Sequence, residues 1–270
     1  MNSNSEKLDQ EFPSYQTQLK SFILRITADK QLSEDIVQDA YIKAVDKIES
    51  FRGESSLKTW VFSIAANLAK DKLRSKKQWP EEVLDVCKKA ALGNREFFEE
   101  AMAIRHSSPQ GEFEIKEHIA FCFTCIGKTL PIEQQLCVLL KEVYQFRTKE
   151  VAQILGISEA MVKHHLHLGR TKMTTIFEKR CSIINKKGMC HQCTELNAIF
   201  NPKQNAQEEL TKIKMAKDAE NLDKEKLFDL RADIVNGIDP FESNAAELQL
   251  HHLEHNRKVM EQYIEKAEKN

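Results

Sequence analysis

Two pairs of cysteines have the spacing of metal ligands. Cys122 and Cys125 form one Cys-x-x-Cys motif, and Cys190 and Cys193 form a second. Four thiolates from two such pairs can hold zinc in a tetrahedral site, or bind iron or an iron–sulfur cluster. Cys181 lies shortly before the second pair and is a further candidate ligand. The pattern predicts a zinc or iron site at Cys122, Cys125, Cys190 and Cys193.

Two other interpretations of these cysteines stay open. Phe121, Phe123 and Ile126 surround the first pair, which favours buried free thiols. A redox-active dithiol is the third possibility. Structural disulfides are not expected, because the start of the chain has no basic leader and no apolar run, which predicts a cytoplasmic protein with reduced thiols.

Basic side chains gather in two stretches of the chain. Residues 51–77 contain seven Lys or Arg and two acidic residues, and residues 161–180 contain five Lys or Arg and one acidic residue. Residues 194–270 have the opposite bias, with sixteen acidic and eleven basic side chains. Two basic surfaces on a chain of net charge −1 predict contacts with a polyanion at two places.

The elements that carry the first basic stretch read as helices. Apolar residues recur with helical spacing from Ile36 to Ile48 and again from Trp60 to Leu73. Ser33 is the expected N-cap of the first helix. Residues 51–59 interrupt the periodicity and place an aromatic ring beside cations. With only 8 Gly and 6 Pro in 270 residues, we expect an all-α fold.

The second basic stretch follows a helix-turn-helix pattern. Gly156 can take the left-handed conformation that ends one helix, and Ser158 can cap the next. Val151, Leu155, Ile157, Val162 and Leu166 are the expected shared core. The outward residues of the second helix then suit a recognition helix in a DNA major groove.

The remaining segments have weaker patterns. Residues 79–112 are the expected linker, with a short helix around Phe97–Ile104. Residues 181–270 are an expected helical, charged, cysteine-containing extension that docks on the rest of the chain or on a partner. Its residues His251, His252 and His255 lie one turn apart, and we expect a solvated face there rather than a metal site.

These motifs together resemble the extracytoplasmic-function (ECF) RNA polymerase sigma factors of the sigma-70 family. The segment from Asp35 to Ala44 and the segment from Phe51 to Ala69 are similar to region 2 of that family, and the helix-turn-helix ending at Met173 is similar to region 4. The resemblance covers about residues 15–77 and 127–175. It implies region 2 at residues 11–78, a linker at 79–112, region 4 at 113–180 and an extension at 181–270.

The resemblance implies a function and its partners. Region 2 binds core RNA polymerase and opens the minus-10 promoter element, while region 4 reads the minus-35 element as a duplex. The implied partners are core polymerase and promoter DNA, with an anti-sigma factor as an open alternative and no membrane. No cofactor is required, and no enzyme activity is expected, since the chain lacks a phosphate-binding glycine loop and a nucleophile elbow.

The resemblance also implies site residues, which the chemistry of the side chains suits. An extruded base needs a stacking surface, hydrogen-bonding groups and cations for the backbone. The residues assigned to the minus-10 element are Phe51, Arg52, Ser55, Ser56, Lys58, Asn67, Lys70 and Arg74. Those assigned to the minus-35 element are Ser158, Glu159, Met161, Lys163, His164, His167, Arg170 and Lys172. The polymerase-binding residues are Asp35, Gln38 and Asp39.

A different class of protein remains as the alternative. A stand-alone helix-turn-helix regulator that responds to metal or redox state would use the second basic stretch and the cysteines. It would leave the region 2 motifs without a role.

Overall fold

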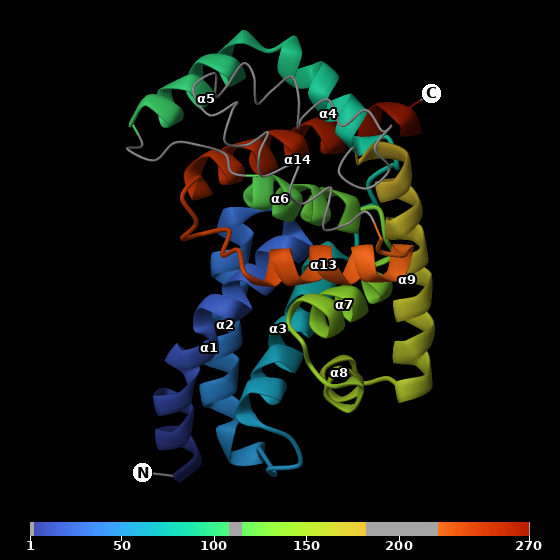
Figure 1. Ribbon diagram of the computed structural model, residues 1–270. Helices are drawn as coiled ribbons and strands as arrows, with labels where there is room; N and C mark the ends of the chain where they lie inside the picture. The colour runs from blue at the N-terminus through green and yellow to red at the C-terminus, as the bar shows by residue number, and fades with distance from the viewer. Residues whose placement is uncertain (1–2, 108–114, 182–220, 270) are drawn as a thin grey trace. The chain divides into compact units, whose positions relative to one another are not determined.

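The computed structural model describes residues 3–107, 115–181 and 221–269. Within these ranges it contains helices and no strand, which confirms the all-α prediction (Figure 1). The elements are α1 (Ser3–Thr27), α2 (Lys30–Lys47), η1 (Ile48–Ser50), α3 (Leu57–Leu73), α4 (Val83–Leu92), α5 (Arg95–Ser107), α6 (Ile115–Gly127), α7 (Ile132–Val138), η2 (Leu139–Val143), α8 (Thr148–Leu155), α9 (Glu159–Arg180), α13 (Lys224–Asn236) and α14 (Ala246–Glu268).

The chain divides into two compact units. Unit 1 consists of residues 1–78 and 130–169, and unit 2 consists of residues 79–129 and 170–270. The domains predicted from the sequence are defined by their expected functions, whereas these two units are defined by packing. The predicted boundaries after residues 78, 112 and 180 stay a prediction.

The core of unit 1 forms where α1, α2 and α3 pack together. Phe22 of α1 and Phe62 of α3 are fully buried, with ring centroids 5.4 Å apart. Ile36 of α2 and Val61 of α3 are also completely buried. The apolar stripes expected from the sequence are therefore the faces that meet in this core.

The segment from α7 to α8 joins the same core. Tyr144 lies edge-on to Phe22 at 5.5 Å, and Phe146 lies 4.9 Å from Phe62 between ring centroids. Gln135 Nε2 donates to the backbone oxygen of Arg25 at 3.0 Å, and Arg25 Nε donates to the Tyr144 hydroxyl at 3.3 Å. Aromatic packing and buried hydrogen bonds thus hold the helix-turn-helix segment of unit 1 against α1 and α3.

Helix α2 begins earlier than the sequence indicated. Its N-cap is Asp29, whose side chain accepts a hydrogen bond from the backbone N–H of Leu32 at 3.0 Å. Ser33, the expected cap, is fully buried one turn inside the helix, and its hydroxyl lies 2.8 Å from that of Thr27. The assignment of Ser33 as the cap was wrong because Asp29 offers a carboxylate one turn sooner.

Unit 2 is built around α6. In Figure 1, α6 lies between α13 and α14, and both helices contact it. The Phe123 ring of α6 lies 5.9 Å from Phe228 of α13 and 6.1 Å from Phe177 of α9. Glu117 is buried and accepts a hydrogen bond from the backbone N–H of Ala245 at 2.8 Å. The described part of the C-terminal extension therefore supplies much of this core.

The expected linker is largely helical. Helix α4 buries Val83, Leu84 and Cys87, and it packs against α14. Helix α5 includes the short helix expected around Phe97–Ile104 and buries Phe97. The weak periodicity of this stretch was misleading, because short amphipathic helices gain their stability from a packing partner rather than from local propensity.

Candidate nucleic-acid interface

The loop between η1 and α3 is shaped by a glycine and a helix cap. Gly53 has a φ of +71°, a conformation that other residues rarely adopt. Ser56 is the N-cap of α3, and its Oγ accepts a hydrogen bond from the backbone N–H of Thr59 at 3.0 Å. Phe51 and Trp60 lie with ring centroids 5.2 Å apart, and both are half-buried. The loop therefore presents a pair of aromatic rings beside the exposed Arg52.

Lys58 is occupied inside unit 1. Its ammonium lies 5.1 Å from the centre of the Phe146 ring and 5.8 Å from that of Phe62. Burial lowers the pKa of Lys58, and the carboxylate of Glu150 acts in the opposite direction. In the same place, Gln153 Nε2 of α8 donates to the backbone oxygen of Glu54 at 3.2 Å. Helix α8 thus covers one side of the loop in this conformation.

The other residues assigned to the minus-10 element lie farther along α3 or in the loop. Asn67 and Arg74 are exposed, while Lys70 is half-buried with its Nζ 4.0 Å from the Glu133 carboxylate. These three lie at helical spacings of three and four residues and so share one face. Ser55 is half-buried, and Ser56 serves as the cap. The structure therefore groups the assigned residues into the loop and one face of α3.

The residues assigned to polymerase binding form a polar face on α2. Asp35, Gln38 and Asp39 are exposed and lie three and four residues apart. Gln31 Nε2 donates to Asp35 Oδ1 at 2.9 Å. Ile42, which is 48% accessible, follows on the same helix and adds an exposed apolar side chain to this face.

The helix-turn-helix has the geometry that its sequence predicts. Gly156 has φ +67° and ψ +33°, and its N–H bonds to the backbone oxygen of Ala152. Ser158 Oγ accepts a hydrogen bond from the backbone N–H of Met161 at 3.2 Å. Gly169 allows a close helix approach, because a Cβ there would lie 2.7 Å from Val138 Cγ2.

The shared core of the two helices differs in detail from the prediction. Val151, Val162 and Leu166 are buried as expected. Ile154 is also buried, with 1% accessible, whereas Leu155 and Ile157 are half-buried. The α8 stripe is therefore centred one residue earlier than expected.

The assigned minus-35 residues fall into two groups. Those in the N-terminal half of α9 and its cap are all exposed: Ser158, Glu159, Met161, Lys163, His164 and His167. These side chains are therefore accessible on unit 1 for the assigned contacts with bases and phosphates. Arg170 and Lys172 belong to unit 2 and are engaged there.

Arg170 and Lys172 already have partners within the protein. Arg170 Nη2 donates to Glu225 at 2.7 Å and to Asp229 at 2.8 Å. Lys172 Nζ donates to the backbone oxygen of Thr129 at 3.0 Å. Their assigned phosphate contacts stay a prediction and would require these bonds to exchange. Sequence reasoning missed Glu225 and Asp229, although their spacing of four residues in an acidic extension was a usable signal.

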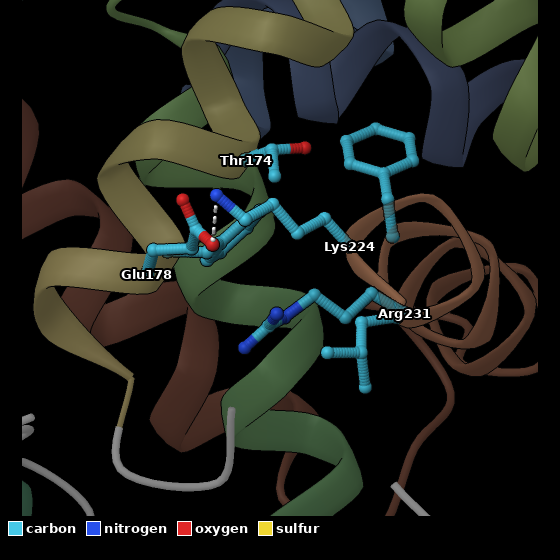
Figure 2. A pocket seen from close by; sticks show the side chains of 7 residues that line it. Thr174, Glu178, Lys224 and Arg231 are labelled. Atoms are coloured by element: carbon cyan, nitrogen blue, oxygen red, sulfur yellow. Dashed lines mark ion pairs between the residues drawn. The ribbon is translucent and has the colours of Figure 1, made fainter. Parts of the chain in front are cut away.

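Unit 2 also contains a small hollow between α9 and α13. Figure 2 shows the ion pair on its wall, in which Lys224 Nζ lies 2.9 Å from Glu178 Oε1. The Arg231 guanidinium lies 4.0 Å from the centre of the Phe177 ring. Apolar side chains and the Lys224–Glu178 ion pair line the hollow. We therefore interpret it as a small gap in the packing of the two helices. Its lining residues are Thr174, Phe177, Glu178, Lys224, Leu227, Phe228 and Arg231.

Cys122 and Cys125 are both buried on α6. Cys125 Sγ accepts a hydrogen bond from Asn256 Nδ2 at 3.6 Å, and Cys87 Sγ donates to the Asn256 backbone oxygen at 3.8 Å. Burial raises the pKa of Cys125 to about 12 and also raises that of Cys87. Cys122 Sγ lies 3.3 Å from His118 Nε2.

The predicted metal site extends beyond what the structure describes. Cys190 and Cys193 lie outside the described residues, and Cys181 is half-buried directly after α9. Among the residues with described positions, no three His, Cys, Asp or Glu side chains form a metal-binding group. In unit 1, Cys137 is also buried, and its pKa is raised to about 12 by burial. The zinc or iron site stays a prediction.

The three histidines of α14 do not form a solvated face. The Phe97 ring stacks on His255 at 4.0 Å and on His251 at 4.8 Å, and it meets His252 edge-on at 5.1 Å. Burial lowers the pKa of His252 to about 4. The expectation of a solvated face was wrong because α5 places an aromatic ring among the imidazoles.

Among the described helices, none is both long enough and apolar enough to cross a membrane.

The chain matches two protein families and is similar to several characterised proteins. Residues 12–79 match the family described as Sigma-70 region 2, and residues 122–173 match Sigma-70, region 4. The ECF RNA polymerase sigma factor SigM of Bacillus subtilis is 28% identical over 172 residues, covering 64% of this chain and 96% of the relative. SigX of the same organism is 26% identical over 160 residues, covering 58% and 77%.

Further similarities come from Escherichia coli and from a solved structure. The ECF RNA polymerase sigma-E factor of Escherichia coli is 28% identical over 157 residues, covering 58% of this chain and 78% of the relative. The sigma factor RpoE of Bartonella quintana, solved with the anti-sigma factor NepR, is 20% identical with a TM-score of 0.44, covering 64% and 98%. The family matches end at residue 173, so they leave α13 and α14 unmatched.

Proposed function

Because the chain belongs to the extracytoplasmic-function group of the sigma-70 family, we propose that its two basic surfaces divide promoter recognition between them. The protein is an RNA polymerase sigma factor that binds core polymerase and promoter DNA. We assign recognition of the minus-10 element to α3 and the loop before it in unit 1, and recognition of the minus-35 element to α9.

The observation that supports this division best is the form of the two surfaces. The loop offers paired aromatic rings, Phe51 and Trp60, with a neighbouring exposed cation, Arg52. Such a site suits an unstacked base and its backbone. The N-terminal half of α9 is capped, exposed and polar, as reading base edges in a major groove requires.

Recognition of the minus-10 element requires energy to extrude a base. Unstacking costs a few kcal/mol, which stacking and backbone contacts must offset. We assign stacking to Phe51, backbone contacts to Arg52, Lys70 and Arg74, and hydrogen bonds to Ser55 and Asn67. Lys58 joins them only when its ammonium leaves the Phe62 and Phe146 rings that now cover it.

In recognition of the minus-35 element, some residues position the protein on the DNA backbone and others read the base sequence. Lys163 contacts phosphates, and Glu159, Met161, His164 and His167 approach base edges from the exposed face of α9. Asp35, Gln38 and Asp39 provide the acidic and amide groups for a basic helical surface of core polymerase. We also propose that the protein acts in the cytoplasm, bound to core polymerase, and catalyses no reaction of its own.

The cysteine site is a separate part of the proposal. Zinc or iron at Cys122, Cys125, Cys190 and Cys193 would require Cys125 to exchange its Asn256 hydrogen bond for a metal bond. Metal content after anaerobic purification tests this assignment. The metal should fall in a Cys190→Ser/Cys193→Ser variant, and equal metal in both proteins would exclude the site. An anti-sigma factor remains a proposal that co-purification from cells can test.

In vitro transcription tests the function directly. Core polymerase of the source bacterium should initiate at defined start sites on genomic fragments only when the protein is added. An Arg52→Ala/Arg74→Ala variant should lose most of this activity, while a Lys89→Ala/Lys116→Ala variant with the same charge loss on exposed residues of unit 2 should keep it. If the protein binds operator DNA but forms no complex with core polymerase, the stand-alone regulator is the better description.

A further inference from the structure

Arg170 is held by the C-terminal extension through three hydrogen bonds and a cation–π contact. Its Nη2 donates to Glu225 Oε2 at 2.7 Å and to Asp229 Oδ1 at 2.8 Å, and its Nε donates to Glu225 Oε2 at 3.2 Å. The guanidinium carbon lies 4.6 Å from the centre of the Phe228 ring. The Arg170 side chain is only 18% accessible as a result. Two carboxylates and an aromatic face therefore enclose one cation.

Helix α13 is positioned by contacts other than those with Arg170. Asp223 caps it by accepting a hydrogen bond from the backbone N–H of Lys226 at 2.9 Å. Phe228 is 2% accessible and packs against Phe123. Lys224 pairs with Glu178 on the next turns of α9, as Figure 2 shows. Contacts other than the Arg170 ion pairs therefore also hold α13 in place.

The arrangement resembles a phosphate site occupied from within the protein. A guanidinium presents a planar fork of donors that suits carboxylate and phosphate oxygens equally. Arg170 cannot hold Glu225 and Asp229 and also bind a DNA phosphate with the same N–H groups. Lys172, two residues farther along α9, is likewise engaged by the Thr129 carbonyl, and its Nζ lies 3.7 Å from Glu81. Both cations assigned to phosphate contacts in this half of α9 are therefore satisfied internally.

We infer that α13 is an internal competitor of promoter DNA for Arg170, so that the C-terminal extension restrains DNA binding until α13 is displaced. The inference rests on the proposed role of α9 in binding the minus-35 element. It gives the extension a regulatory role: a signal or partner that draws Glu225 and Asp229 away releases one phosphate-binding cation.

Neutral, isosteric variants of the full-length protein test this inference. Glu225→Gln/Asp229→Asn removes both carboxylates from Arg170 with little change in shape. Glu242→Gln/Glu247→Gln is the matched control, because it makes the same change in net charge at exposed positions of unit 2. Binding to a fluorescein-labelled DNA duplex is measured by anisotropy over a series of salt concentrations.

The expected result is a gain in affinity that depends on Arg170. The Glu225→Gln/Asp229→Asn variant should bind DNA about fivefold more tightly than the control variant, the size expected of one or two partly exposed ion pairs. Its plot of log affinity against log salt should be steeper by about one contact. Adding Arg170→Gln should abolish the gain. Equal binding by the two double variants would overturn the inference.

Two further measurements keep the outcomes distinct. If the unmodified protein directs start-site-selective transcription while both double variants bind DNA equally, the competitor role is wrong and the sigma function stands. If the unmodified protein gives no such transcription, the sigma function itself fails. Should the carboxylate variant not fold, hydrogen exchange on the unmodified protein decides: DNA should speed exchange at Lys224–Asn236, and unchanged exchange would contradict displacement.

Discussion

Replacing Phe228 with alanine tests whether the C-terminal extension is part of the core of unit 2. Phe228 is 2% accessible, and its ring contacts Phe123 of α6. Truncating a buried phenylalanine costs about 3–5 kcal/mol of unfolding free energy. The hollow beside Phe228 lets neighbouring side chains relax, so we expect a loss near the lower limit, about 3 kcal/mol.

Urea unfolding followed through tryptophan fluorescence can measure this loss. The chain has two tryptophans, and in a Trp60→Phe background Trp79, buried in unit 2, is the reporter. With a slope of about 2 kcal/mol per molar urea, a loss of 3 kcal/mol lowers the midpoint by about 1.5 M. Reporting from one unit avoids treating both units as a single two-state transition.

An exposed aromatic residue of the same unit provides the control. Tyr263→Ala removes a ring of α14 that is 44% accessible, and it should change the free energy of unfolding by less than about 0.5 kcal/mol. Phe228→Leu should fall between the two variants. If Phe228→Ala lowers the stability seen at Trp79 by less than about 1 kcal/mol, α13 is not an integral part of this core.

Three further predictions concern the recognition helix and the histidines. Ser158→Ala should lower thermal stability by about 1 kcal/mol through loss of the α9 cap, whereas Ser158→Thr and the exposed Ser75→Ala should have little effect. Lys163→Ala should weaken binding to all duplex sequences and reduce the salt slope by about 1, and Lys89→Ala should leave the slope unchanged. The folded-state pKa of His252 is about 4, below the ordinary value of 6.5, so the unfolded chain takes up the proton first and stability falls as pH drops between these values. His252→Gln should therefore reduce the difference in urea midpoint between about pH 7.5 and about pH 5, while the same change at the exposed His164 should not.

The sequence was most informative where structure depends on local signals. Gly156 and Ser158 act through their own backbone and neighbouring N–H groups, so their roles could be predicted from residue type and spacing. The apolar stripes of α2 and α3 likewise predicted which faces are buried. The N-cap of α2 was misplaced because Asp29 and Ser33 are both good cap residues, and only the backbone conformation distinguishes them.

The features that depend on distant partners could not be predicted in this way. Helix α4 is short, and its apolar face gains stability from α14, more than 150 residues later. Phe97 and the three α14 histidines show no periodic signal that would bring them together. The pairing of Arg170 with α13 is another long-range contact, and a basic residue on a recognition helix otherwise suggests only DNA. The assignment of individual promoter contacts stays a prediction.

The buried cysteine thiols allow the opening of each compact unit to be followed by chemical labelling. Only a thiolate reacts quickly with an alkylating reagent, and burial raises the pKa of Cys87, Cys125 and Cys137. These side chains can be modified only while the surrounding helices are open. Cys137 belongs to unit 1, and Cys87 and Cys125 belong to unit 2. The order in which mass spectrometry detects their alkylation therefore reveals which unit opens first.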